Sequence, residues 1–237
     1  MGVSFGLRLE RGRHCRRPPG GLGPARTSRP PQEPSAQRHV RRRKRQCQRL
    51  GRWALSVSGF LTQGVVFTFF PLLAHERGFT PAAIGLLFLV LGLANTLARF
   101  PAGWLVDRTG RCAPYAIGGV LVASVATAML PYFDGQTILF ALVAVFGAVS
   151  GIAFVAISVA LAASTTPAAR GIVMGGYSTC LYLGLALGSF ALGPVITHQG
   201  YTVGFVVGGA AGAIGTLAAA LLWATGGSPR DEGAVSS

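Results

Sequence analysis

Residues 137–164 read TILFALVAVFGAVSGIAFVAISVALAAS, a run in which no side chain is charged. A helix needs about 20 predominantly apolar residues to cross the hydrocarbon core of a bilayer, and this run is long enough. In lipid, every backbone polar group must be satisfied inside the segment that carries it, which argues against a buried strand. The run therefore predicts a transmembrane α-helix.

Five further runs are similar in length and in apolar character, and turn residues separate them. The GFTP sequence at residues 78–81 offers a helix stop, a threonine cap and a proline at the first helical position. Gly200 stands between the last two runs. We predict an all-α polytopic membrane protein with six transmembrane helices. The six predicted spans cover residues 53–75, 82–106, 113–133, 137–164, 171–198 and 201–225.

The net charge of +14 is concentrated at the N-terminus, where residues 1–52 carry fifteen of the 21 Lys and Arg residues. Such a Pro- and Arg-rich segment has few large apolar residues, so we predict a disordered cytoplasmic tail over residues 1–52. The membrane domain then covers residues 53–226, and residues 227–237 form a short cytoplasmic tail. The basic run at residues 41–45 could bind anionic lipid or nucleic acid nonspecifically. We interpret it as a solvated segment that fixes orientation, and we expect no specific nucleic-acid partner.

Basic residues in the short loops predict the orientation of the chain in the bilayer. Three loop arginines and one C-terminal arginine fall on the same side as the basic tail, namely Arg108, Arg111, Arg170 and Arg230. The opposite loops hold Arg77, beside Glu76, and Asp134. We therefore predict that both termini are cytoplasmic and that the chain lies in the plasma (inner) membrane.

The cysteines give no sign of a metal or redox site. Cys15, Cys47, Cys112 and Cys180 are scattered, with no pair at the spacing of metal ligands or of a dithiol motif. We expect four unpaired thiols, no metal and no cofactor.

The loop after the second span carries the most specific motif of the chain. Residues 103–111 read GWLVDRTGR. This resembles G-x-x-x-D-R-x-G-R, the signature loop of the major facilitator superfamily, which follows the second helix of a six-helix half on the cytoplasmic side. The resemblance implies a role for each signature residue. Gly103 lets a neighbouring helix approach and Gly110 allows a tight turn, Asp107 places an anion at the membrane edge, and Arg108 and Arg111 hold the loop on the inner face.

The resemblance also indicates which part of such a transporter the chain represents. Members of the superfamily have twelve helices in two halves, each built as a 3+3 inverted repeat. Gly184, Gly188 and the Gly193–Pro194 pair resemble the pattern of the fifth and eleventh helices. The fourth span lacks the R-x-x-Q-G pattern, and Arg99 ahead of Pro101 resembles the eighth helix. We interpret the chain as an MFS-like half, more similar to the C-terminal one, which needs a second six-helix half or a homodimer.

In this superfamily the substrate path lies between the halves, and the first and fourth helices of each half line it. The candidate residues for the substrate path or its gating are Thr62, Gln63, Thr68, Asn95, Arg99, Ser150, Ser158 and Tyr177. Arg99 is the first of these, because a charge inside a membrane is costly and marks function by default. The alternative is that Arg99 reaches the inner interface or pairs with Asp107. No span holds an acidic residue, so a proton coupled through a carboxylate of this half is not expected.

Two other functions compete with transport. Rhomboid intramembrane proteases also have six helices, with a G-x-S-G serine in the fourth and a histidine in the sixth. Here residues 148–151 read AVSG and His198 lies outside the sixth span, so the serine has no base and we do not expect an enzyme. The resemblance to the major facilitator superfamily implies a secondary transporter of a small solute, and this is the function that we predict. A non-transporting membrane subunit, or an inactive transporter fragment, stays open as the alternative.

Overall fold

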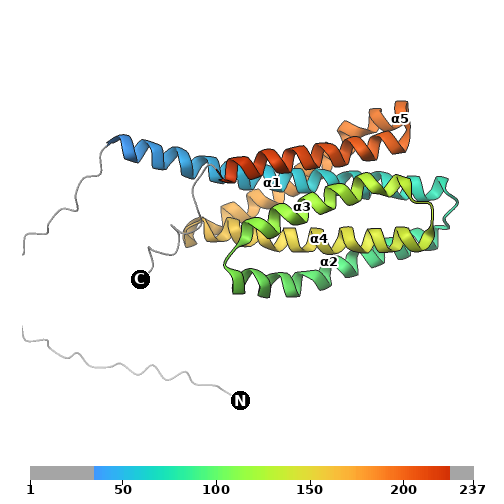
Figure 1. Cartoon of the computed structure of the whole chain (residues 1–237), viewed down its shortest axis with the longest axis horizontal. Helices are drawn as coiled ribbons and strands as arrows, with labels where there is room; N and C mark the ends of the chain where they lie inside the picture. Colours follow the sequence, from blue (N-terminus) through green and yellow to red (C-terminus); the bar gives the residue numbers. More distant parts are fainter. Residues whose placement is uncertain (1–34, 225–237) are drawn as a thin grey trace, which may run out of the picture.

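A computed structural model describes residues 35–224 as a bundle of long α-helices (Figure 1). The elements are α1 (Ser35–Glu76), α2 (Pro81–Thr109), α3 (Cys112–Met129), η1 (Leu130–Tyr132), α4 (Gln136–Ala163), η2 (Pro167–Ala169) and α5 (Arg170–Ala224). All five α-helices are long and apolar enough to cross a membrane. The predicted all-α, multi-pass fold is confirmed.

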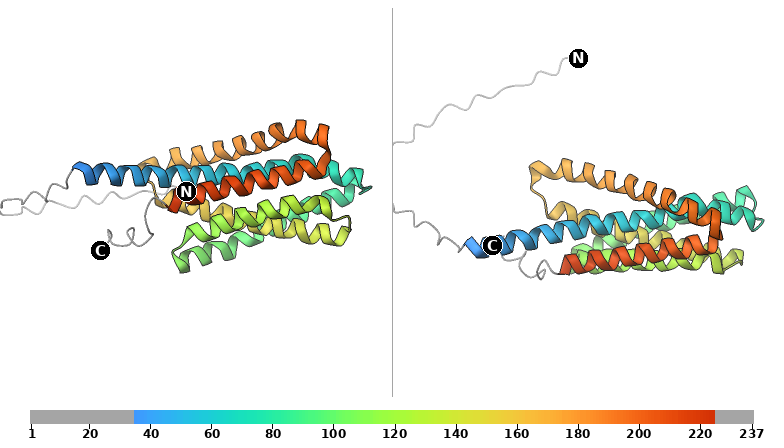
Figure 2. Two further views of the ribbon diagram at one scale, coloured as in Figure 1. Left: turned by 45° about the horizontal axis from the view of Figure 1, so that its top comes forward. Right: turned by 90° about the horizontal axis from the view of Figure 1, so that it is seen from above.

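Helix α5 contains a chain reversal at Gly200, where the backbone angles (φ 84°, ψ 168°) are not helical. Glycine takes such a positive φ readily because it has no Cβ. The two arms, residues 170–199 and 201–224, run in opposite directions from this point with α1 between them (Figure 2). The sequence predicts six helices, whereas residues 35–224 form five, because the last two predicted spans join at the bend of Gly200 without an intervening loop.

Glycines bring neighbouring helices together at two crossings. A Cβ added at Gly147 or Gly151 of α4 would collide with the backbone of α2 at Leu91 or Asn95. A Cβ added at Gly184 or Gly188, in the first arm of α5, would collide in the same way with α1. Backbones that touch gain the close van der Waals contact on which helix association in lipid depends. These two glycine pairs therefore serve helix packing.

The interior is divided into two apolar clusters along the length of the bundle. One cluster includes Phe70, Leu139 and Phe146, and the other includes Leu55 and Ile157. The residues where the two clusters adjoin, on α1, α3 and α4, also line a small cavity. A small cavity therefore interrupts the apolar packing at this junction.

Helix α1 begins at Ser35, eighteen residues before the first predicted span. The predicted disorder of residues 1–52 is therefore wrong for residues 35–52. This segment contains no proline and is rich in Arg and Gln, which favour helix. Its end is also held by tertiary contacts, since Arg52 Nη1 donates to the carbonyl of Ala160 (3.2 Å) and the guanidinium lies 5.2 Å from the centre of the Trp223 ring. The predicted tail residues 1–34 and 227–237 lie outside the described part.

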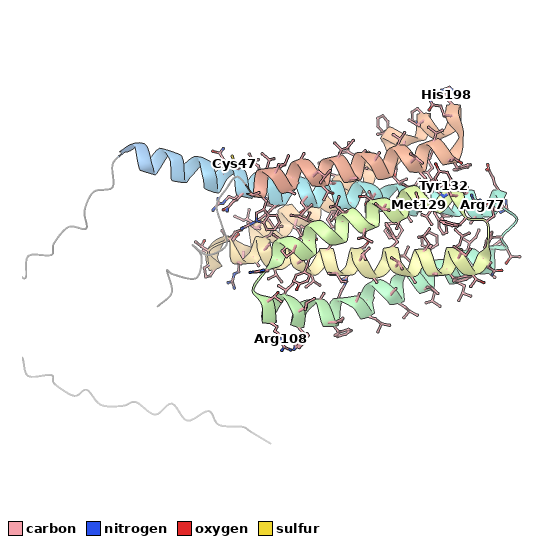
Figure 3. The ribbon with its side chains drawn as sticks, in the orientation of Figure 1. Cys47, Arg77, Arg108, Met129, Tyr132 and His198 are labelled. Atoms are coloured by element: carbon pink, nitrogen blue, oxygen red, sulfur yellow. The ribbon has the colours of Figure 1, made fainter. Side chains whose placement is uncertain are left out.

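Arg77 and Arg108 lie at opposite ends of the bundle (Figure 3). At its end, Arg77 joins the loop after α1 to the loop after α3. Its guanidinium donates to the carbonyls of Leu130, Pro131 and Phe133, and its Nε lies 3.2 Å from the Asp134 carboxylate. The loops that the charge pattern assigns to opposite sides of a membrane are thus at opposite ends of the helices.

Helix α2 lies at the edge of the bundle (Figure 1), where it packs mainly on α4. Only 11% of the most apolar 18-residue stretch of α2 is buried inside the protein, against 50% of the corresponding stretch of α1. Its exposed large apolar residues form a long stripe: Leu86, Leu89, Leu93, Leu97, Phe100 and Trp104. An apolar surface of this size suits contact with lipid or with another helical unit.

Candidate functional site

The cavity at the junction of the two clusters lies between α1, α3, α4 and the first arm of α5. The cavity is small, with room for about one water molecule. The lining residues of α1 and α4 recur at helical spacing, so each helix presents one face to the cavity. They are Ser56, Gly59, Phe60, Gln63, Val120, Ala123, Ser150, Ala153, Phe154, Ile157 and Tyr177.

Four polar side chains face this cavity, and two of them are satisfied within their own helix. Ser56 donates to the carbonyl of Arg52 (3.0 Å) and Ser150 to the carbonyl of Phe146 (2.6 Å). The hydroxyl of Tyr177, which is 5% exposed, makes no hydrogen bond with any described residue. A buried polar group of this kind asks for an explanation, because an unmade hydrogen bond is costly.

Three aromatic rings form one wall of the cavity. The ring centres of Phe60 and Phe154 lie 6.4 Å apart, and Tyr177 lies 5.6 Å from Phe60 and 5.4 Å from Phe154. Aromatic pairs at such distances stabilise one another beyond their burial. The three rings join α1, α4 and the first arm of α5 into one aromatic cluster.

Arg99 of α2 stacks on this aromatic cluster. Its guanidinium carbon lies 4.4 Å from the centre of the Phe154 ring. Nε and Nη2 both donate to Oδ1 of Asn95 (3.1 and 2.7 Å), and Asn95 Nδ2 donates to the carbonyl of Gly147 (3.1 Å). Asn95 therefore holds the guanidinium against α4. The structure brings five of the eight path candidates together, with Gln63, Ser150 and Tyr177 in the cavity and Asn95 and Arg99 at its aromatic wall.

The other three path candidates lie elsewhere. Thr62 is fully buried, donates to the carbonyl of Gly59 (2.7 Å) and faces Gly212 in the second arm of α5. Thr68 is hydrogen-bonded to Ser189 (2.6 Å), and Ser158 donates to the carbonyl of Val155 (2.9 Å). These hydroxyls serve helix packing in this structure, and none of the three lines the cavity.

Gly103 and Gly110, the two glycines of the signature loop, lie in different surroundings. Gly110 ends α2 with a left-handed backbone (φ 62°), and its N–H donates to the carbonyl of Val106 (2.8 Å). This confirms the predicted tight turn. A Cβ at Gly103 would meet no other atom within 4 Å, so no helix of the described chain approaches it. The expectation of a close neighbour at Gly103 is wrong within this chain, because α2 lies at the edge of the bundle.

The charged residues of the signature loop are all exposed. The guanidinium of Arg108 lies 5.0 Å from the centre of the Trp104 ring. Arg111 precedes the first turn of α3 in extended backbone and makes no capping bond with its side chain. Asp107 forms no ion pair within residues 46–224, so the pairing with Arg99 considered from the sequence is not formed.

Sequence reasoning missed three residues of the site, namely Ser56, Phe60 and Phe154. Helical spacing could have identified them, because Ser56 precedes Gln63 by seven residues and Phe154 follows Ser150 by four. Polarity within an apolar span identifies Tyr177 but not Phe60 or Phe154, because an apolar ring does not stand out from the residues around it.

The charge of the site is positive and is not neutralised by an acid. Among residues 46–224 the acids are Glu76, Asp107 and Asp134, all exposed at the ends of the bundle. That part of the chain also holds no group of three His, Cys, Asp or Glu residues arranged to bind a metal. Its cysteines, Cys47, Cys112 and Cys180, form no disulfide with one another. Arg99 is thus the one Asp, Glu, Lys or Arg residue within the six predicted spans.

The family comparison agrees with the signature loop and with the helical architecture. Residues 53–236 match the sequence profile of the Major Facilitator Superfamily, a match that covers all of the predicted membrane domain. The basic segment before residue 53 lies outside the match. Together with five apolar helices long enough to cross a membrane, this match shows that the chain is a multi-pass membrane protein and belongs to the Major Facilitator Superfamily of transporters.

Proposed function

We propose that the chain is one half of an MFS-type secondary transporter that moves a small solute across the plasma membrane. Its six spans are α1 to α4 and the two arms of α5, arranged as a 3+3 inverted repeat with both termini cytoplasmic. A second six-helix half, or a second copy of the chain, supplies the facing wall of the path. The arginine-free α4, and Arg99 ahead of Pro101 in α2, favour the C-terminal half.

The exposed position of Arg99 carries this proposal. Ionisable side chains within membrane spans face a bundle interior or a water-filled path, because contact with lipid is costly. Arg99 is exposed on the least covered helix, beside the aromatic wall of the cavity. A facing half would enclose it and place it in the path between the halves.

Two features of the signature loop support the same arrangement. Gly103 has open space where a neighbouring backbone could pack, and Asp107 has no ionic partner in residues 46–224. Both would acquire a neighbour if the second half packed against the exposed side of α2.

Uptake into proteoliposomes tests the proposal. The chain is reconstituted alone and together with the polypeptide encoded beside it, and uptake is measured over a panel of radiolabelled small solutes. Saturable uptake by the complex, lost in Arg99→Gln, supports transport. A stable complex with no uptake would instead identify a non-transporting subunit.

Orientation is tested separately by labelling of single cysteines with an impermeant maleimide. The native cysteines are first replaced by serine, and Asp107→Cys and Asp134→Cys are then introduced in turn. We expect Asp107→Cys to react only from the cytoplasmic side and Asp134→Cys only from the outside. Labelling of both from one side would exclude the proposed topology.

A further inference from the structure

We infer that the solute is a small organic monocarboxylate whose carboxylate is bound by the guanidinium of Arg99. This inference rests on the proposed function and adds the chemical class of the solute. Three observations lead to it. They are the charge of the spans, the direction in which the guanidinium points, and the edge of the guanidinium that makes no hydrogen bond within the described residues.

The charge of the site selects an anion. Arg99 carries the one formal charge within the predicted spans, and no acid lies near it among the described residues. A positive charge in a region of low dielectric constant attracts an anion strongly, whereas a neutral solute would leave it uncompensated and a cation would be repelled. A monoanion cancels one arginine, while a divalent anion such as hydrogen phosphate would leave a net negative charge in the path.

The guanidinium points toward the middle of the bundle and away from the end that carries Arg108. It is bound to Asn95, which lies one helical turn before Arg99 and so farther from the signature loop. It is also held over the Phe154 ring of α4. A side chain that reached the inner interface would point the other way, so the alternative of an interfacial arginine does not fit this geometry.

The open edge of the guanidinium has the shape that a carboxylate requires. Asn95 occupies the edge formed by Nε and Nη2, and Phe154 covers one face. Nη1 makes no hydrogen bond with another described residue, so Nη1 and the second hydrogen of Nη2 form a free pair of parallel donors. Two parallel N–H donors bind the two oxygens of a carboxylate in a fork.

The surroundings of this edge suit an organic solute better than an inorganic ion. The half-buried ring of Phe154 stands next to the guanidinium, backed by the rings of Phe60 and Tyr177. The cavity behind the rings admits only about one water, so the body of the solute lies over Phe154 on the side that faces the second half.

Binding of radiolabelled benzoate to the purified full-length chain in lipid nanodiscs tests this inference. Benzoate presents a carboxylate and a planar apolar ring, and benzamide is its neutral isostere. We expect saturable benzoate binding that unlabelled benzoate displaces and that benzamide and inorganic phosphate do not. Arg99→Gln should weaken it about tenfold or more, and Arg99→Lys, which keeps the charge and loses the fork, should give an intermediate loss.

Arg170→Gln is the matched control, because it removes an exposed positive charge outside the site. It should bind benzoate like the unaltered chain, and circular dichroism with thermal unfolding checks that each variant is folded. Displacement by benzamide as strong as by benzoate, equal losses in Arg99→Gln and Arg170→Gln, or no saturable binding at millimolar benzoate would each overturn the inference.

The outcome also separates this inference from the proposed function. If the complex took up a neutral or cationic solute, and Arg99→Gln left that uptake unchanged, the monocarboxylate assignment would be wrong while transport stood. Saturable, Arg99-dependent benzoate binding without uptake of any solute by the complex would support the binding site and refute the transport function.

Discussion

Two arginines occupy contrasting regions of the bundle, Arg77 at one end and Arg99 within the predicted second span. Arg77 is 17% exposed, donates to three backbone carbonyls and faces the carboxylate of Asp134. Arg99 is exposed, bonds to a single amide oxygen and has no carboxylate near it. Hydrogen bonds made within the fold stabilise the folded chain, whereas donors left open are available to a ligand. The first arrangement is that of a structural arginine, and the second suits the binding role that we propose for Arg99.

The contrast between the two arginines depends on the close contact between α2 and α4, which holds Asn95 and Arg99 against α4. Gly151→Leu places a side chain where α4 touches the backbone of Asn95, so the two helices must separate. We expect the free energy of unfolding to fall by about 3 kcal/mol, at the upper end of overpacking effects. Gly92→Leu, in open space on α2, is the control and should change it by less than about 0.5 kcal/mol. Reversible unfolding in detergent measures both, and equal effects would show that the crossing is not tightly packed.

Removal of each arginine in turn tests the contrast directly. Arg77→Gln leaves three carbonyls with fewer donors and separates the loops after α1 and α3, so we expect a loss of about 2 kcal/mol in unfolding free energy. Arg99→Gln leaves no buried group unpaired and should change stability by less than about 1 kcal/mol. If Arg99→Gln were the more destabilising of the two, the assignment of Arg99 as a binding residue would lose its basis.

The difference between the arginines can also be removed by design. Asn95→Asp would give Arg99 a carboxylate at the position of the present oxygen, as Asp134 does for Arg77. The positive charge would then be cancelled within the chain, and we expect benzoate affinity to fall about tenfold, or about 1.4 kcal/mol.

In Asn95→Asp, the free energy of unfolding should change less than the free energy of benzoate binding. The loss of the bond to the Gly147 carbonyl costs about 0.6 kcal/mol, the average for a hydrogen bond between membrane helices. Binding titrations and unfolding measured on the same preparation separate the two effects. Unaltered benzoate affinity in Asn95→Asp would contradict the role given to the uncompensated charge.

The sequence predicts the helices well because their signals are local. Long apolar runs locate α2, α3 and α4 to within a few residues, and the turn at Gly110 follows from the signature loop. Two local features were harder to predict. Residues 35–52 extend α1, since their helix propensity and the contacts of Arg52 outweigh the high charge. The chain reverses at Gly200, where the sequence separates its last two spans, but no loop stands between the two arms.

The site could be predicted only in part, because a side chain's neighbours depend on how the helices are rotated against one another. The charge of Arg99 within a span was visible from the sequence, since it needs no partner to be unusual. Its stacking on Phe154 was not visible, because 55 positions separate the two residues. The same reason explains Thr62 and Gln63, adjacent in the sequence, of which Thr62 faces the second arm of α5 and Gln63 the cavity.

The smallest effect is expected at Asp134, and it decides what makes Arg77 structural. The side chain of Asp134 is 83% exposed, so its attraction to Arg77 is screened by water and salt. We expect Asp134→Asn to cost about 0.5 kcal/mol, much less than Arg77→Gln, because the carbonyls of Leu130, Pro131 and Phe133 keep their donor. A double-mutant cycle between Arg77→Gln and Asp134→Asn should then give a coupling energy below about 1 kcal/mol. If Asp134→Asn cost as much as Arg77→Gln, the carboxylate would be the main partner of Arg77, and hydrogen bonds to carbonyls would not suffice to tell the two arginines apart.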